Sequence, residues 1–193
     1  ADILSLIPNS VGSYKPPTIA IAALGAIILI GFLSFNTSTK TDIESFSELS
    51  GLENLRDSEG LTFDSSSLVG KSIVINFFAS WCEPCRREII EIQRINDRSY
   101  KPDKASNYLD EKSVVFVGIN SGETDEVKAQ QLITETKASY LILFGDDGTL
   151  LQEVGAVGLP FTIFVNTQGQ IVGKHLTAMA ADDVFNLLEK YFP

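Results

Sequence analysis

Cysteine and histidine, the usual ligands of structural metal sites, are scarce in this chain. Its 193 residues include two cysteines, Cys82 and Cys85, and one histidine, His175, which lies far along the chain and which we expect to be an ordinary strand residue near the surface. A structural zinc ion takes four ligands, typically Cys and His, so we predict no metal site. A disulfide within Cys-x-x-Cys closes a very short loop, and stabilisation by loop closure grows with loop length. A purely structural disulfide is therefore disfavoured too.

Basic residues are also in deficit. The chain has 15 Lys and Arg against 25 Asp and Glu, which gives a net charge of −10. Phosphate backbones repel such a surface, so we expect no nucleic-acid partner. Hydrophobic residues make up 44% and charged residues 21%, as in ordinary globular proteins. The chain therefore has enough apolar surface to fold.

One stretch lacks charge altogether. The segment "TIAIAALGAIILIGFLSF", residues 18–35, contains no Asp, Glu, Lys or Arg. As a helix it would be about 27 Å long, close to the thickness of a bilayer core. A buried core helix normally has a polar stripe, and a cleavable signal ends at a small-residue site that "NTSTK" does not offer. We predict a retained transmembrane helix at 18–35, with a cleaved signal as the alternative.

The predicted span divides the chain into four parts. Residues 1–17 form a short tail, placed in the cytoplasm, 36–42 a polar linker, and 43–193 a globular domain. Lys15 and Lys40 lie on opposite sides of the span, so counting positive charges gives only a weak orientation signal.

The globular part has a regular order of patterns. Buried-type apolar runs alternate first with amphipathic segments, which favours parallel strands, and a turn at "NTQGQ" then predicts an antiparallel hairpin. This is the order of a thioredoxin fold in the α/β class. We predict a short hairpin from 52–56 and 60–63, strands at 72–79, 113–120, 140–144, 161–166 and 170–176, and helices at 83–96, 124–137, 146–155 and 180–192. Thr124 or Ser121 is expected to cap the second helix.

The stretch "NFFASWCEPCRREI" joins a predicted strand to a predicted helix at the two cysteines. Cys82 falls at or near the helix N-cap, where unpaired N–H groups and the helix dipole favour a thiolate. Such positions lower a cysteine pKa from about 8.5 to roughly 3.5–7.5. We therefore predict a redox pair in which Cys82 attacks and Cys85 resolves, with no cofactor other than this redox-active disulfide.

The residues around the cysteines are expected to tune the pair. Pro84 fits the first helical turn, where its missing N–H costs nothing. Glu83 adds negative charge beside Cys82, which predicts a weaker thiolate and hence a reductant rather than an oxidant. Trp81, the only tryptophan, is either a packing aromatic or a platform beside the reactive sulfur.

Two longer segments of the chain resemble a known group of proteins. "LVGKSIVINFFASWCEPC" and "VGLPFTIFVNTQGQIVG" resemble segments of the membrane-anchored, extracytoplasmic thioredoxin-like proteins of bacteria, the TlpA/ResA/CcmG-like group, from about Leu61 to the C-terminus. The resemblance implies a thiol–disulfide oxidoreductase on the extracytoplasmic face of the cell membrane. It also implies a disulfide-containing protein substrate, such as apocytochrome c, and a membrane electron-donor protein.

Other functions remain open for the same fold. The chain could be a general or copper-site thiol reductase, or a non-enzymatic interaction module within a membrane complex.

The resemblance also implies roles for single residues. Pro160 matches a cis proline that faces the Cys-x-x-Cys segment, and it would expose the Leu159 backbone to an incoming substrate. We therefore expect Leu159, together with Trp81, Glu83 and Pro84, to surround the substrate.

Two polar positions distinguish the chain from cytosolic thioredoxin. Asn76 stands where thioredoxin has a buried Asp, and Asn cannot take up a proton. In the context "GINSGE", Glu123 matches an acidic residue that the group carries after the next strand. A carboxyl near the cysteines would have a raised pKa and could act as a general base. The alternative is a carboxylate that only starts the next helix.

One segment departs from the group. "DRSYKPDKASNYLDEKS", residues 97–113, is longer than this connection usually is. A solvated insertion is the favoured interpretation, and a partner-specific loop the alternative.

Overall fold

The computed structural model describes residues 43–193. The predicted tail, transmembrane helix and linker at 1–17, 18–35 and 36–42 lie outside the described residues, so they remain predictions. Among the described residues, no helix is both long enough and apolar enough to cross a membrane.

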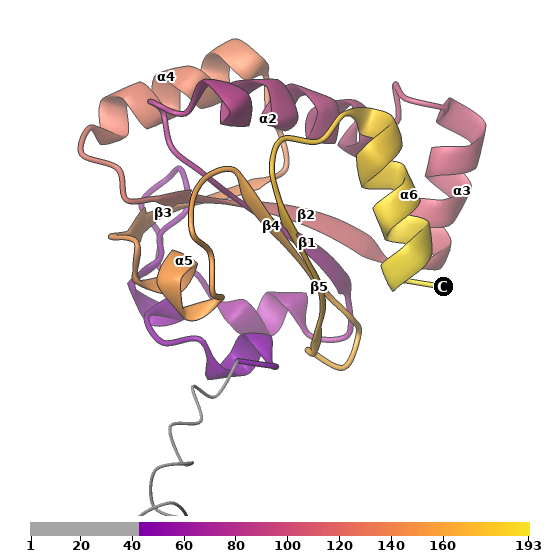
Figure 1. Ribbon diagram of the computed structural model, residues 1–193, viewed down its shortest axis with the longest axis horizontal. Coiled ribbons are helices and arrows are strands. Elements are labelled where there is room, and N and C mark those ends of the chain that lie inside the picture. Colours follow the sequence, from indigo (N-terminus) through magenta and orange to yellow (C-terminus); the bar gives the residue numbers. More distant parts are fainter. Residues whose placement is uncertain (1–42) are drawn as a thin grey trace, which may run out of the picture. The chain divides into compact units, whose positions relative to one another are not determined.

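The fold is built on one mixed sheet with the strand order β3-β2-β1-β4-β5 (Figure 1). The strands are β1 (Ser72–Phe78), β2 (Val114–Ser121), β3 (Leu141–Asp146), β4 (Phe161–Val165) and β5 (Ile171–Leu176). β1 pairs parallel with β2, and β2 parallel with β3, whereas β4 is antiparallel to both β1 and β5. The predicted parallel core and antiparallel hairpin are confirmed. β1 lies in the centre, and all seven of its residues are buried.

Helices cover both faces of the sheet (Figure 1). One apolar cluster joins side chains of the sheet to α2 (Glu83–Asn96), α3 (Pro102–Glu111), α4 (Glu126–Thr136) and α6 (Ala181–Tyr191). The other joins the opposite face to α5 (Thr149–Glu153) and to the segment before β1. A central strand between two such clusters has no polar alternation, which is why "SIVINFF" is almost entirely apolar.

The segment before β1 differs from the prediction. It contains three 3-10 helices, η2 (Phe46–Glu48), η3 (Leu52–Asn54) and η4 (Ser65–Leu68). The predicted hairpin is reduced to a single bridge between Arg56 and Thr62, and Arg56 also bridges to Phe144 on β3. The hairpin prediction is wrong over most of its length because Leu52 and Leu55 are buried against the sheet instead of alternating along a strand.

The favoured interpretation of residues 97–113 is also wrong, because the segment contains the helix α3 and packs on the core. Ala105 and Leu109, one turn apart, are buried, and so is Tyr100 just before the helix. The Tyr108 hydroxyl donates to the backbone oxygens of Leu188 and Phe192 at 2.7 and 2.8 Å. α3 therefore supports α6.

The start of α4 needs a smaller correction. Its N-cap is Asp125, not Thr124 or Ser121, and the Asp125 carboxylate accepts the Lys128 N–H at 3.3 Å. Ser121 is still part of β2, so the helix begins later than the sequence suggested.

Candidate active site

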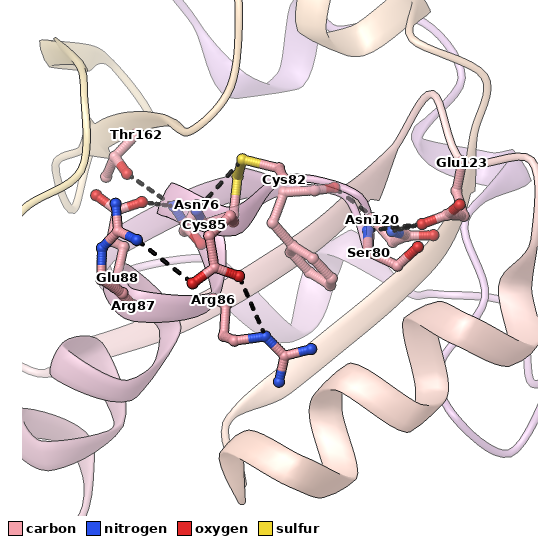
Figure 2. The surroundings of a disulfide bond; sticks show 12 residues. Asn76, Ser80, Cys82, Cys85, Arg86, Arg87, Glu88, Asn120, Glu123 and Thr162 are labelled. Atoms are coloured by element: carbon pink, nitrogen blue, oxygen red, sulfur yellow. Dashed lines mark hydrogen bonds and ion pairs between the residues drawn. A yellow bond between two sulfur atoms is a disulfide. The ribbon is translucent and has the colours of Figure 1, made fainter.

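The two cysteines lie where the central strand gives way to a helix. β1 ends at Phe78, a short turn follows, and Cys82 is the N-cap of α2 as predicted. Its Sγ accepts the backbone N–H of Cys85 at 3.2 Å, and the two sulfurs form a disulfide (Figure 2). Cys85 is fully buried and Cys82 is 5% exposed, so the N-terminal sulfur is the one nearer to solvent. A nucleophile at Cys82 and a resolving thiol at Cys85 fit this order.

The residues flanking the cysteines are on the surface. Trp81 is 64% exposed, so a packing role in the core is excluded. Pro84 lies in the first turn of α2. Glu83 lies 3.8 Å from Arg86 and 3.4 Å from Arg87, which offsets part of the negative charge that it brings to Cys82. Its tuning effect is therefore weaker than an isolated carboxylate would have.

A buried carboxyl that the sequence analysis did not single out lies below the disulfide. Glu88 on α2 is fully buried, three residues after Cys85 and thus on the same helix face. One of its oxygens, Oε2, lies 2.6 Å from the Asn76 side-chain nitrogen on β1, which is also 3.1 Å from the Thr162 hydroxyl on β4 (Figure 2). The group therefore joins α2 to the two central antiparallel strands.

Burial dominates the electrostatics of Glu88. It raises the pKa of the carboxyl to about 8, although hydrogen bonds from Asn76 and the Met179 backbone act in the opposite direction. A carboxyl with this pKa exchanges protons near neutral pH. The signal was present in "CEPCRREII", since a residue three positions after a buried cysteine faces the same way, but its charge suggested the solvent face.

Glu123 lies on the other side of the cysteine turn and serves as an acceptor. Its Oε2 accepts the Ser80 N–H at 2.7 Å (Figure 2). Its Oε1 accepts the N–H groups of Thr124 and Asp125 at 3.0 and 3.2 Å. Partial burial raises the pKa of Glu123, but these bonds and one from Asn120 outweigh it, so the pKa lies below its usual value. The expected rise in pKa is wrong.

A groove of about 420 Å³ opens beside Trp81, between the cysteine turn and α4. Most of the side chains that line it are polar or charged, and Trp81 and Leu132 are the apolar ones. The lining residues are Ser80, Trp81, Arg86, Glu123, Thr124, Asp125, Lys128, Gln131, Leu132 and Glu135.

The proline of the second sequence segment belongs to the same end of the sheet. Phe161, directly after Pro160, pairs with Phe77 near the end of β1. Because the two strands are antiparallel, Pro160 and the turn that leads to Cys82 lie at the same end of the sheet. The Leu159–Pro160 bond is cis, as predicted. Pro160 is buried and Leu159 half-buried.

His175 lies on a strand, away from the two cysteines in sequence. His175 pairs in register with Thr162 on the edge strand β5 and is half-buried. Within residues 43–193, no three His, Cys, Asp or Glu side chains gather so that they could hold a metal ion.

Comparison with known proteins agrees with this geometry. The family model described as Redoxin matches residues 40–189, which is most of the chain. The chain belongs to the redoxin family. Together with the relatives below, this match confirms the resemblance to the TlpA/ResA/CcmG-like group, and with it the assignment of the domain as a thiol–disulfide oxidoreductase.

The redoxin domain has curated relatives among the bacilli. The whole chain is 28% identical over 170 residues to the thiol-disulfide oxidoreductase ResA of Bacillus subtilis, covering 84% of this chain and 87% of that protein. ResA of Halalkalibacterium halodurans is 27% identical over 139 residues, covering 72% of this chain and 73% of that protein.

Solved structures share the fold of this redoxin domain. The thioredoxin domain of a thiol-disulfide oxidoreductase from Bacteroides vulgatus matches with a TM-score of 0.57 and 23% identity, over 72% of this chain and 91% of that one. StoA of Bacillus subtilis matches with a TM-score of 0.54 and 23% identity, over 68% of this chain and 92% of that one. The predicted thioredoxin-like fold is confirmed.

Proposed function

We propose that this protein is a membrane-anchored reductase of protein disulfides, with its catalytic domain on the extracytoplasmic face. The observation that carries the proposal is the Cys82–Cys85 pair at the start of α2, directly above the buried carboxyl of Glu88.

The proposed reaction begins with the reduced pair. The Cys82 thiolate attacks one sulfur of a substrate disulfide, forms a mixed disulfide and releases the other substrate sulfur as a thiolate, which takes a proton from water. Cys85 then loses its proton and attacks Cys82 Sγ. The Cys82–Cys85 bond forms, and the second substrate sulfur leaves as a thiolate and is protonated. Two electrons pass from the enzyme to the substrate, and a membrane electron-donor protein restores the dithiol.

Glu88 is the proposed acceptor for the Cys85 proton. Glu88 and Cys85 lie on the same face of α2, and both are fully buried. The Cys85 thiol therefore cannot easily lose its proton to water. A carboxyl with a pKa of about 8 matches a thiol better than an ordinary carboxylate does. Glu123, whose pKa is lowered, is proposed as a positioning residue for the cysteine turn.

The reducing direction is supported by the charges around the pair. A dithiol is a strong oxidant when its reduced form is stabilised, as by a favoured thiolate. Here an exposed carboxylate, Glu83, and a buried carboxyl, Glu88, flank the cysteines, and neither favours a thiolate. Arg86 and Arg87 offset only the exposed one. A measured reduction potential below that of glutathione would agree with the proposal.

The substrate is proposed to lie across the exposed end of the site. Trp81, Glu83 and Pro84 form one side, all exposed around Cys82, and the Leu159 backbone with Pro160 forms the other. An extended segment of the substrate would pair with the Leu159 backbone, and the Trp81 indole would contact the substrate at the groove described above.

The anchor, the location and the substrate class depend on sequence resemblance. The uncharged segment 18–35 would hold the domain at the membrane, and the linker 36–42 would separate the two. Apocytochrome c, whose Cys-x-x-Cys-His segment needs free thiols for haem attachment, is the substrate that this resemblance favours.

Substrate trapping in membranes tests the function. In Cys85→Ala the second attack cannot occur, so we expect Cys82 to hold substrates as mixed disulfides that dithiothreitol releases. Cys82→Ala/Cys85→Ala is the matched control and should capture nothing. Failure of Cys85→Ala to capture any protein would contradict a reductase role, and capture of proteins without haem-attachment segments would point to a general or copper-site reductase.

A further inference from the structure

The Asn76 side chain holds the centre of a short polar row. Asn76 on β1 pairs in register with Thr162 on β4, and Glu88 reaches the same point from α2. The Asn76 nitrogen lies 2.6 Å from Glu88 Oε2 and 3.1 Å from Thr162 Oγ1 (Figure 2). Both side chains, Asn76 and Glu88, are at most 1% exposed. The row is thus sealed from solvent in the middle of the domain.

Two atoms of this row have no hydrogen-bond partner among the described residues. They are the Asn76 oxygen and the second Glu88 oxygen, Oε1. Buried polar atoms normally have partners, so an unpartnered one calls for an explanation. An atom that gains its partner in another protonation state is one such explanation. The other faces of Glu88 are accounted for. Cys85 lies on the same helix as Glu88, the Met179 backbone lies near enough to lower the pKa of Glu88, and Tyr140, ahead of β3, has its pKa raised by burial and then by the Glu88 charge.

The hydrogen-bonding chemistry of Glu88 explains why its partner, Asn76, is an amide. An ionised carboxylate only accepts hydrogen bonds, whereas a protonated carboxyl also donates one. An amide has a donor end and an acceptor end of nearly the same size, so a half turn of its plane exchanges them without moving the backbone. The Thr162 hydroxyl can accept from the nitrogen or donate to the oxygen.

We propose that Asn76 is a positioning residue that serves both protonation states of Glu88 by turning its amide over. This inference rests on the proposed function, in which Glu88 gains and loses a proton in each cycle. With ionised Glu88, the Asn76 nitrogen donates to Glu88 and Thr162, which is the arrangement in the structure. With protonated Glu88, the Asn76 oxygen accepts from both.

This device suits the buried setting of Glu88. β1 is fixed between two apolar clusters, so the strand cannot shift when a proton arrives. The pKa of about 8 for Glu88 places both states within reach near neutral pH. An Asp at position 76 could not replace the amide, because an ionised Asp would only accept and would repel the ionised Glu88.

Nuclear magnetic resonance of the oxidised full chain, labelled at the Asn side-chain nitrogens, tests the turn directly. Above the midpoint of Glu88 ionisation, we expect a strong nuclear Overhauser contact between the Asn76 NH₂ protons and the Thr162 methyl group. Below that midpoint the contact should weaken, because the oxygen then faces Thr162. The midpoint itself is measured from the infrared band of the protonated carboxyl.

Three variants sharpen the test. In Glu88→Gln the band should vanish and the Asn76 contact should stop changing with pH. Asn76→Leu removes the donor to Glu88 and should raise the midpoint of Glu88 ionisation by about one pH unit or more. Thr162→Val keeps the shape of the side chain and should change this midpoint less. The same contact on both sides of the midpoint, or a change that persists in Glu88→Gln, would overturn the proposal.

The outcome is separable from that of the proposed function. The amide turn is measured in the oxidised protein with no substrate present. If it occurs while Cys85→Ala captures no protein, only the reductase proposal fails. If capture succeeds without the turn, only the role of Asn76 fails.

Discussion

The Ser80 backbone N–H donates to Glu123 Oε2 at 2.7 Å, so the loop after β2 holds the turn that leads from β1 to Cys82. Asn120, buried at the end of β2, adds contacts of 3.4 Å to the Phe78 oxygen and 3.5 Å to the same Glu123 oxygen. Two loops that are distant in sequence are thereby joined beside the disulfide. The carboxylate fixes the path of the chain at the nucleophile.

Replacing Glu123 separates this positioning role from acid–base catalysis. Glu123→Ala should lower the free energy of unfolding by about 1–3 kcal/mol, because it leaves the Ser80 N–H without an acceptor, and should slow substrate reduction. Glu123→Gln keeps an acceptor oxygen and should retain most of both. The pKa of Glu123 is lowered, so it is ionised throughout the neutral range, and Glu123→Gln should not change the pH profile between pH 6 and 9. Loss of a limb of that profile would show that Glu123 is a general base after all.

Glu88 should make stability depend on pH in an unusual direction. Its pKa rises from an ordinary 4.5 to about 8 on folding, so between these values the folded chain holds a proton that the unfolded chain has released. The stabilisation is complete below pH 4.5 and is lost as the pH rises through 8. In urea unfolding at pH 5, 7 and 9, the free energy of unfolding should fall less with rising pH for Glu88→Gln than for the wild type. The exposed Glu59→Gln is the control and should follow the wild type; equal falls in all three proteins would contradict the assignment.

Gly118 is expected to tolerate no side chain. It pairs with Asn76 on β1, and a Cβ there would lie 2.8 Å from Ile142 Cδ1 and 3.2 Å from rings of both Phe78 and Tyr140. Overpacking of this kind typically costs about 1–3 kcal/mol, so Gly118→Ala should show that loss in denaturant unfolding. Gly158→Ala, where a Cβ meets nothing within 4 Å, is the control for stability. Equal stabilities would mean that the surrounding side chains move aside freely.

The Tyr108 hydroxyl should contribute to stability but not to catalysis. It donates to two backbone oxygens near the end of α6, those of Leu188 and Phe192. Tyr108→Phe removes only the hydroxyl, whose single proton these two oxygens share, and should lower the free energy of unfolding by about 0.5–1.5 kcal/mol. The rate of disulfide reduction should stay at the wild-type value. A reduced rate at unchanged stability would instead support α3 as a partner-binding element.

Trp81 should show the opposite behaviour. Because it is 64% exposed, Trp81→Ala should change the free energy of unfolding by no more than about 0.5 kcal/mol. If the indole covers bound substrate, KM for a protein disulfide should rise while the reaction with a small disulfide stays the same. An equal effect on both substrates would assign Trp81 to the cysteines themselves.

Much of the architecture could be predicted because its determinants are local. The bounds of α2 follow from the N-capping Cys82, the proline in the first turn and the spacing of Ile89, Ile92 and Ile95. β1 was recognisable as an unbroken apolar run. By contrast, the sequence favours a solvated insertion where α3 lies, since only Ala105 and Leu109 mark its buried side. Their burial depends on an apolar cluster formed with residues far away along the chain.

The sequence by itself determined the chemistry of this protein, because two cysteines at this spacing, with no further ligands, leave little besides thiol–disulfide exchange. It also determined the order of strands and helices along the chain, through the period of its apolar residues. Only the tertiary structure decided which carboxyl accompanies the cysteines. Glu123 and Glu88 are the same residue type in the sequence. Backbone N–H groups bind Glu123 and lower its pKa, whereas burial raises the pKa of Glu88. A proton affinity depends on what folding brings around the group.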